Sequence, residues 1–137
     1  MTADSQWALQ QALHAALAGD AALQAFLGNP ARVFDRVPQD GAFPYLVIGE
    51  DTTGPFDTKT EDGMEHRLTI HTWSRYRGLK ETKQIMAAVT AALDGQSLSV
   101  TGHTLVLLRQ EFGATFLDPD GLTRHGVQRF RALTQAQ

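Results

Sequence analysis

The side chains that could support metal binding or acid–base catalysis do not gather into a recognisable site. His66 and His71 are five residues apart on an expected strand, so the period of two sends them to opposite faces and denies them a shared metal. Asp118 and Asp120 flank a proline, which favours a tight turn over a calcium site with its about six to eight oxygens. The sequence has no cysteine, which excludes thiolate nucleophiles, cysteine zinc sites and disulfides.

Motifs for nucleophilic catalysis and for phosphate binding are also missing. The serines, at positions 5, 74, 97 and 99, occur in no G-x-S-x-G context. Neither G-x-G-x-x-G nor G-x-x-x-x-G-K-[ST] occurs. We therefore expect a protein that is not an enzyme and that has no catalytic residues, cofactor or metal site.

Nucleic-acid binding has one partial signal, a group of basic and aromatic residues where a strand is expected to turn into a helix. These residues are Arg75, Tyr76, Arg77, Lys80 and Lys83. Such a corner could hold phosphates, but Arg and Lys stems that cover apolar surface explain it more simply. The formal net charge of -3 supplies no global positive field that would collect nucleic acid.

The length of 137 residues most simply predicts one domain, residues 1–137, that buries roughly two thirds of its unfolded surface. A hydrophobic fraction of 42% and a charged fraction of 20% are ordinary for a globular protein. No apolar run approaches the roughly 20 residues of a membrane span, and the N-terminus lacks the basic region of a signal peptide. We expect a soluble protein that is made and assembled inside a cell.

The element around which the rest is organised is the stretch 65–95. Its first half alternates, which predicts a strand with Leu68 and Ile70 on one face, beside His66 and Thr72. The opposite face carries mainly charged and aromatic side chains: Arg67, Thr69, His71, Trp73 and Arg75. After Gly78 the period changes to that of a helix whose apolar stripe is formed by Ile85, Val89, Ala92 and Leu93 and which ends at Gly95.

Helices are also predicted at the N-terminus. Asp4 or Ser5 can cap a first helix, and Asp20 can cap a shorter second one. The apolar positions of the two helices are Leu9, Ala12, Leu13, Ala16, Leu17, Leu23, Phe26 and Leu27. His14 lies on the flank of the first stripe, and we expect a surface or boundary histidine there rather than a ligand.

Two strands and a loop are predicted between the N-terminal helices and the central strand. Residues 32–37 are a short strand candidate, and the apolar run 44–49 predicts a strand covered on both faces. Residues 50–63 are rich in acids, threonine and glycine, so we expect a mobile loop between two strands. Phe56 stands alone in this loop, either folded back on its own domain or anchored on a partner.

The chain is expected to close on a hairpin formed by residues 104–117 and 122–133 around the turn 118–121. One parity of the outgoing strand carries Val106, Leu108, Gln110, Phe112 and Phe116. On the return strand, one parity carries Gly126, Gln128, Phe130 and Ala132, and the other carries His125, Val127, Arg129, Arg131 and Leu133. An arginine-bearing face is either wetted or meets another chain. Together the elements predict an α+β fold, with a mixed or antiparallel sheet of about five strands under a long helix and an N-terminal helical segment.

The order of these elements, over most of the chain, resembles the tail terminator or tail completion proteins of long-tailed phages and of the related gene transfer agents. The matching pieces are the helix with Leu9, Leu13 and Leu17, the strand 44–49, the polar loop, the strand 66–74, the helix with Ile85, Val89 and Leu93, and the segment 125–131.

The resemblance implies a structural role without a catalytic motif. Such proteins form a six-membered ring on the head-proximal end of the finished tail tube, stop its growth and present a surface for joining the head. The implied partners are further copies in a homo-hexamer, the tail tube protein, the head–tail connector protein, and DNA that passes through the lumen without specific binding. The implied location is the tail of a virion or gene transfer agent particle that is assembled in the host cytoplasm.

An assembling protein needs contact surfaces, and an exposed sheet edge or a charged strand face can provide them. The residues expected at an interface are Phe56, Arg67, His71, Trp73, Arg75, Arg129 and Arg131. Two other classes of function stay open at this point: a small α+β ligand-binding or regulatory domain with a pocket between helix and sheet, and an enzyme whose constellation the spacing does not reveal.

Overall fold

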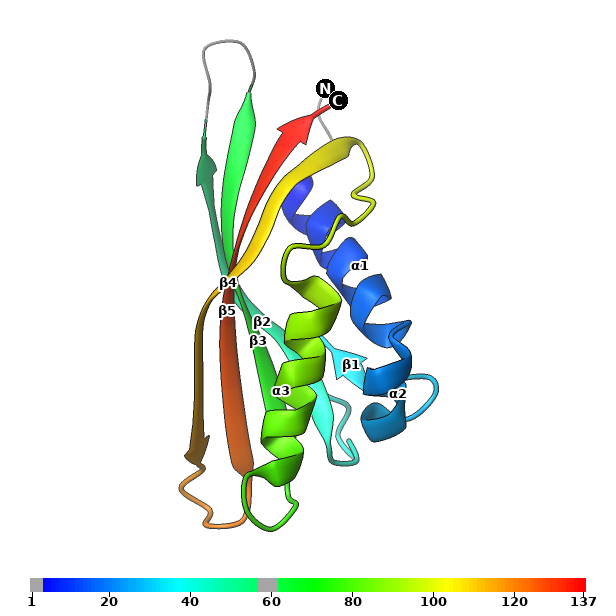
Figure 1. The fold of residues 1–137 in the computed structure, drawn as a ribbon, viewed down its shortest axis with the longest axis vertical. Coiled ribbons are helices and arrows are strands. Elements are labelled where there is room, and N and C mark those ends of the chain that lie inside the picture. Colours follow the sequence, from blue (N-terminus) through cyan, green and yellow to red (C-terminus); the bar gives the residue numbers. More distant parts are fainter. Residues whose placement is uncertain (1–3, 57–61) are drawn as a thin grey trace.

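The computed structural model describes residues 4–56 and 62–137, which form three helices and five strands. The helices are α1 (Ser5–Ala18), α2 (Ala21–Leu27) and α3 (Lys80–Leu93). The strands are β1 (Val33–Phe34), β2 (Tyr45–Pro55), β3 (Gly63–Ser74), β4 (His103–Leu117) and β5 (Arg124–Ala136). All three helices lie on one side of the sheet (Figure 1). The expected α+β class is confirmed.

The strands form one mixed sheet in the order β1-β2-β3-β5-β4. β1 runs parallel to β2, and the other neighbouring pairs are antiparallel. The last strand of the chain, β5, therefore lies inside the sheet, between β3 and β4. The two long edges are β4 on one side and, on the other, β2 with the short strand β1 against part of it.

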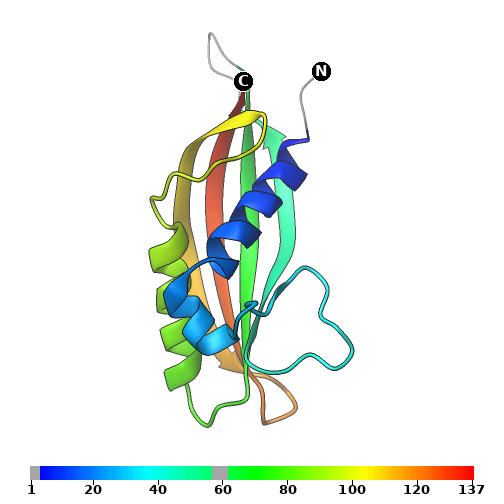
Figure 2. The same cartoon turned by 90° about the vertical axis from the view of Figure 1, so that its right-hand side faces the viewer.

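The core lies between the helices and the face of the sheet that they cover (Figure 2). Its fully buried apolar side chains are Leu17, Leu23, Leu27, Leu46, Ile70, Ile85, Val89, Leu93, Phe130 and Ala132. The predicted stripe of α3 and the predicted apolar face of β3 are confirmed, because both supply members of this set. Full burial of one such aliphatic side chain stabilises a fold by about 1.5–3 kcal/mol.

The ends of the helices follow the local signals in the sequence. Asp4 caps α1, where its Oδ1 accepts a hydrogen bond from the backbone N–H of Gln6 at 3.0 Å. Asp20 caps α2 by accepting from the N–H of Leu23 at 3.0 Å. Gly95, just after α3, has φ of 72°, a left-handed conformation that glycine adopts without a Cβ clash.

The strands before β3 differ from the prediction. The candidate 32–37 contains only the two-residue strand β1. The run 44–49 is not covered on both faces: Leu46 and Ile48 are buried, whereas Tyr45 and Val47, on the other face, are half-buried. The difference arises because all three helices pack on one side, so the second face has no layer over it.

The expected mobile loop 50–63 is largely a β-hairpin. β2 continues to Pro55 and β3 begins at Gly63, with Asp51 opposite Leu68 and Pro55 opposite Met64. The prediction was wrong for these residues because backbone pairing with β3 orders a polar strand without burial of apolar side chains. The tip of the expected loop, residues 57–61, lies outside the described residues.

The predicted parity of β4 is broken by two shifts of register, between Leu105 and Leu107 and between Gln110 and Phe112. Leu108 is buried as expected, but Phe112 and Phe116 are 45% and 47% exposed. The second shift is the cause, because one extra residue in a strand moves every later side chain to the other face. Both phenylalanines therefore lie on the face of the sheet that the helices do not cover. There Phe112 pairs with Arg129 and Phe116 with His125 of β5.

His66 is a buried histidine on the helix-covered face of β3. Its side chain is 1% exposed, and its Nε2 lies 2.9 Å from Oγ1 of Thr134. Burial disfavours the imidazolium and lowers the pKa of His66 below its ordinary value. The unfolded chain therefore binds this proton more readily than the folded chain does.

We expect stability to fall on acidification through the ordinary histidine pKa of about 6.5, because protonation of His66 then favours the unfolded state. Urea unfolding at about pH 7.5 and about pH 5.5 measures this loss. The variant His66→Gln should show a smaller difference between the two pH values than the unsubstituted protein. An unchanged difference in the variant would assign the effect to other groups.

Candidate functional site

The face of the sheet opposite the helices, here named the open face, holds most of the predicted interface residues. Arg67, His71 and Trp73 project to it from β3, and Arg129 and Arg131 from the neighbouring strand β5. The register places Arg67 directly opposite Arg131, and Trp73 opposite His125. Strand alternation thus brings these residues together from two segments that are far apart in the sequence.

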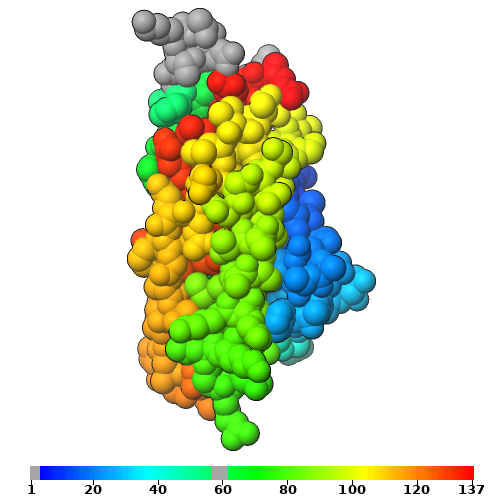
Figure 3. All heavy atoms as spheres, in the orientation of Figure 1, coloured from blue at the N-terminus to red at the C-terminus, as the bar shows by residue number. Residues whose placement is uncertain are grey.

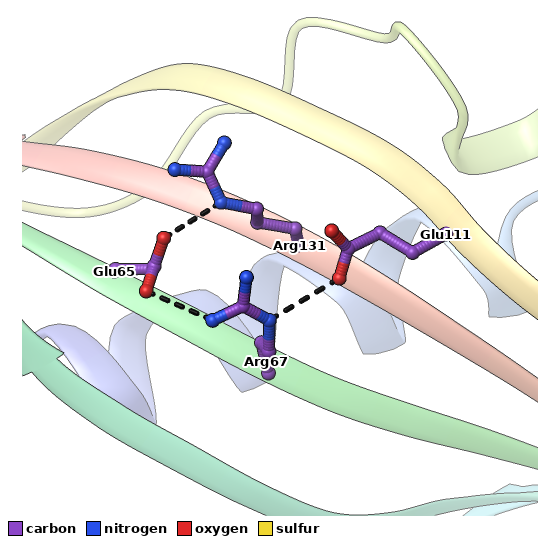
Figure 4. Close-up of polar contacts among 4 residues, drawn as sticks. All are labelled: Glu65, Arg67, Glu111 and Arg131. Atoms are coloured by element: carbon purple, nitrogen blue, oxygen red, sulfur yellow. Dashed lines mark hydrogen bonds and ion pairs between the residues drawn. The ribbon is translucent and has the colours of Figure 1, made fainter.

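A network of four charged side chains lies at one end of the open face (Figure 4). Glu65 pairs with Arg67 at 2.9 Å through Oε1 and with Arg131 at 2.7 Å through Oε2. Arg67 also donates from Nε to Oε1 of Glu111 at 3.2 Å. The hydrogen bond from Arg131 lowers the pKa of Glu65, and the hydrogen bond to Glu111 raises the pKa of Arg67.

Arg67 and Glu111 are exposed, and Glu65 and Arg131 are partly exposed, so the network contributes little to stability. It does fix the side chains of three strands in one arrangement, with the acids and the arginines alternating across the face. Glu111 takes part because it follows Gln110, which pairs with Phe130 on the core face, so strand alternation directs Glu111 to the open face. A surface of mixed charge that is held in place suits recognition of a complementary surface better than it suits binding of a polyanion.

The other end of the open face is a cluster of aromatic rings. The rings of Trp73 and His125 are stacked, with centroids 3.8 Å apart and an angle of 10° between their planes. Phe116 meets His125 edge to face, with centroids 4.7 Å apart. His71 lies between β2 and β5, where its Nδ1 is 2.7 Å from Nε2 of His125 and its Nε2 is 3.2 Å from Oε1 of Glu50.

Burial, and then the neighbouring His71, lower the pKa of His125 below its ordinary value. His125, Phe116 and Glu50 were not among the predicted site residues. His125 could have been predicted from the sequence, because it shares a strand face with Arg129 and Arg131. Glu50 and Phe116 offered no such signal, because register shifts in β2 and β4 decide which face they join.

Phe56 and Arg75 lie at opposite ends of the open face. The guanidinium of Arg131 lies 5.7 Å from the ring centroid of Phe56, whose side chain is 43% exposed. Arg75 stacks on Phe43 at 4.4 Å and donates to Oγ1 of Thr123 at 3.2 Å. Contacts within the chain therefore occupy Arg75, the first residue of the basic corner that was considered for phosphates.

The turn 118–121 is confirmed, with the N–H of Gly121 donating to the carbonyl oxygen of Asp118 at 3.0 Å. Asp120 accepts from the hydroxyl and the N–H of Thr123 and from the N–H of Leu122. These hydrogen bonds, that from the Thr123 side chain first, lower the pKa of Asp120 to about 2. Within residues 4–56 and 62–137, no group of three or more His, Asp or Glu side chains could hold a metal ion.

The helix side of the molecule has a hollow of about 480 Å³ beside the edge of β2. It is lined by Trp7, Gln10, Gln11, His14, Val33, Phe34, Asp35 and Ile48. His14 lies at its rim as the expected surface histidine, with Nε2 3.1 Å from the carbonyl oxygen of Val33. In the described part of the chain, no helix has the length and apolar character that would span a membrane.

Comparisons with known proteins agree with one another. The model of the family described as tail completion protein gp17 matches residues 11–135. The tail completion protein gp17 of Bacillus phage SPP1 is 31% identical over 93 residues, which cover 68% of this chain and 69% of the relative.

Solved structures show the same likeness. A chain from the virion of a native gene transfer agent particle is 28% identical, with a TM-score of 0.88 over 96% of this chain and 98% of its own. A second solved chain, 15% identical with a TM-score of 0.55 over 98% of this chain and 97% of its own, shares the fold alone. The match of residues 11–135 to one family model covers most of the sequence. The chain belongs to the tail completion protein gp17 family, a family of structural proteins and not of enzymes.

Proposed function

We propose that this chain forms a hexameric ring that caps the head-proximal end of a tail tube, ends its elongation and helps to join the tail to the head. The observation that carries the proposal is the superposition of nearly the whole chain on a chain of a gene transfer agent virion, with a TM-score of 0.88. The name of the matching family, tail completion protein, supports the same role.

The open face is proposed as an assembly surface. It has no covering layer in the described chain, and it carries both a fixed pattern of charges and a cluster of aromatic rings. Aromatic and arginine side chains are the usual anchors of protein interfaces. We assign the contacts with the tail tube protein or the head–tail connector protein to Phe56, Arg67, His71, Trp73, Arg75, Arg129 and Arg131.

DNA that passes through the ring would meet no specific binding site on this chain. The formal charge of -3 and the pairing of Arg67 and Arg131 with Glu65 leave no strong positive field for phosphates. A particle component of this kind is assembled in the host cytoplasm and ends in the tail of a virion or gene transfer agent.

The ligand-binding alternative has one observation in its favour, the hollow beside α1. This hollow lies between α1 and the sheet, as that alternative requires, whereas the side chains of Ile85, Val89 and Leu93 fill the space under α3. A stable monomer that binds a small molecule at Trp7 and His14 would favour this alternative over the ring.

Mass measurement at micromolar concentration, alone and with purified tail tubes, tests the ring. We expect six times the mass of the chain, at least in the presence of tubes. A monomer under both conditions would contradict the proposal.

In tail-joining assays, Trp73→Ala should reduce joining more than Tyr76→Ala, since Tyr76 is exposed at the corner before α3. Equal activity of the two variants would remove Trp73 from the assembly surface.

A further inference from the structure

The edge of the sheet formed by β4 is covered over only its first half. Near the end of α3, Gly95 donates its N–H to the carbonyl of Leu108 at 2.7 Å. Asp94 accepts the N–H of Gln110 through Oδ1 at 2.8 Å. No such contact reaches residues 113–117 from the described part of the chain. Backbone groups of this second half are therefore open to a partner.

The opposite edge, β2, is covered over its other half. β1 pairs with Leu46 and Val47 at the start of β2. Residues 51–55 have β3 on one side and, among the described residues, no strand on the other. Each long edge of the sheet thus has one covered half and one open half.

The open halves present their hydrogen-bonding groups at matching intervals. The N–H of Asp118 donates to the carbonyl oxygen of Thr123, at the start of the return strand. Backbone groups of successive residues point alternately toward and away from the paired strand. Those of Gly113, Thr115 and Leu117 therefore point away from β5. On β2, the same alternation starts from Phe56, whose N–H donates to the carbonyl oxygen of Gly63 on β3. The outward residues of β2 are therefore Asp51, Thr53 and Pro55.

We propose that the open half of β2 in one copy pairs with the open half of β4 in the next copy. This inference rests on the proposed ring and assigns the contact that closes it. Since β2, β3, β5 and β4 alternate in direction, β2 and β4 run in opposite directions, and the joint continues the antiparallel sheet. Antiparallel alignment sets Thr53 opposite Thr115, with Asp51 opposite Leu117 and Pro55 opposite Gly113.

The character of the two edges favours a second copy as the partner. The open half of β4 reads Gly-Ala-Thr-Phe-Leu and has neither charge nor proline, the usual protections of an edge strand. Phe116 and Leu117 are 47% and 52% exposed. In the space-filling view, the orange end of this strand forms an uncovered margin at the lower left (Figure 3). The open half of β2 ends in Pro55, which has no N–H, so pairing of this edge with a second β2 would lack two hydrogen bonds, whereas pairing with β4 lacks one.

The positions of the open halves set how copies join. In Figure 1 the open half of β4 lies at the foot of the sheet and that of β2 at its top, on the opposite edge. Consecutive copies are therefore offset along the strand direction. Such an offset is compatible with a closed ring when the strands are tilted to its axis, as in any closed barrel. A head-to-tail joint of this kind has no two-fold axis.

Disulfide trapping tests the joint in a chain that has no native cysteine. The variants Thr53→Cys and Thr115→Cys are oxidised separately and as a mixture. We expect about tenfold more disulfide-linked dimer in the mixture than in either variant alone, because pairing raises the effective concentration of the two thiols. The double variant should form a ladder of linked oligomers. A matched control mixes Thr115→Cys with Gln39→Cys, which places the thiol in the exposed turn 38–41.

Proline substitution gives a second test with its own control. Thr115→Pro removes an outward N–H, so we expect assembly to be lost with little change in the unfolding midpoint. Ala114→Pro removes an N–H that faces β5 and should destabilise the fold itself.

A correct ring mass without the mixed disulfide, or a ring formed by Thr115→Pro, overturns the edge joint and leaves the ring. Self-linking of Thr115→Cys alone, equal to that of the mixture, would show a two-fold contact and overturn the joint. Linkage that appears only with added tail tube protein would support the joint in a ring that assembles on the tube.

Discussion

Replacement of Phe130 by alanine is expected to lower the free energy of unfolding by about 3–5 kcal/mol. Phe130 has no exposed surface and lies on β5, the strand between β3 and β4, on the face that the helices cover. The loss combines the transfer free energy of the ring with the cost of a cavity that the surrounding strands cannot close. Domains of this size are stable by only about 5–15 kcal/mol, so the variant would be close to its unfolding threshold.

Phe112→Ala is the matched control. Phe112 is 45% exposed on the open face, where Arg129 stacks on its ring at 4.9 Å. Its loss should cost about 1 kcal/mol or less, since only a partly exposed cation–π contact is removed. Chemical denaturation of both variants measures the two values. Equal losses would mean that the register shift in β4 does not move Phe112 away from the core.

Gly63→Ala is expected to destabilise the protein by about 1–3 kcal/mol, because the new methyl group overlaps backbone atoms. A Cβ at this position would lie 2.5 Å from the carbonyl oxygen of Phe56 and 3.2 Å from that of Thr134. Neither oxygen can rotate away as a flexible side chain would. The hairpin of β2 and β3 must therefore open at its end or shift relative to β5.

Gly54→Ala is the control in the same hairpin, because a Cβ there meets no atom within 4 Å. It should be neutral, or stabilise slightly by restricting the unfolded chain. Urea unfolding of the two variants gives the comparison. If Gly63→Ala were as stable as Gly54→Ala, the close packing of this hairpin end would be disproved.

Local features of the fold could be predicted from the sequence because short-range patterns determine them. The change of period from β3 to α3 follows the spacing of Ile70, Ile85 and Val89, whose side chains are all fully buried. Asp4 and Asp20 cap the helices at which they were expected. Each of these features depends on neighbours within about one helical turn or one strand pair, so the sequence carries the whole signal.

The candidate site could be predicted only where simple alternation holds. Arg67, His71 and Trp73 on β3, and Arg129 and Arg131 on β5, project to one face as their parity implied. Five of the predicted interface residues thus lie together, although their role in assembly stays a prediction. Family membership came from the order of the elements along the chain and is confirmed by the match to residues 11–135.

Only the tertiary structure decided that residues 51–55 form a strand and where β2 and β4 shift their register. Residues 51–55 carry no apolar pattern, and they are a strand because β3 supplies backbone partners. Phe112, Phe116 and Glu50 reach the open face because β2 and β4 each shift register against a neighbour. A shift of one residue leaves the sequence period unchanged but exchanges the two faces, so only the pairing of whole strands fixes which side chains meet.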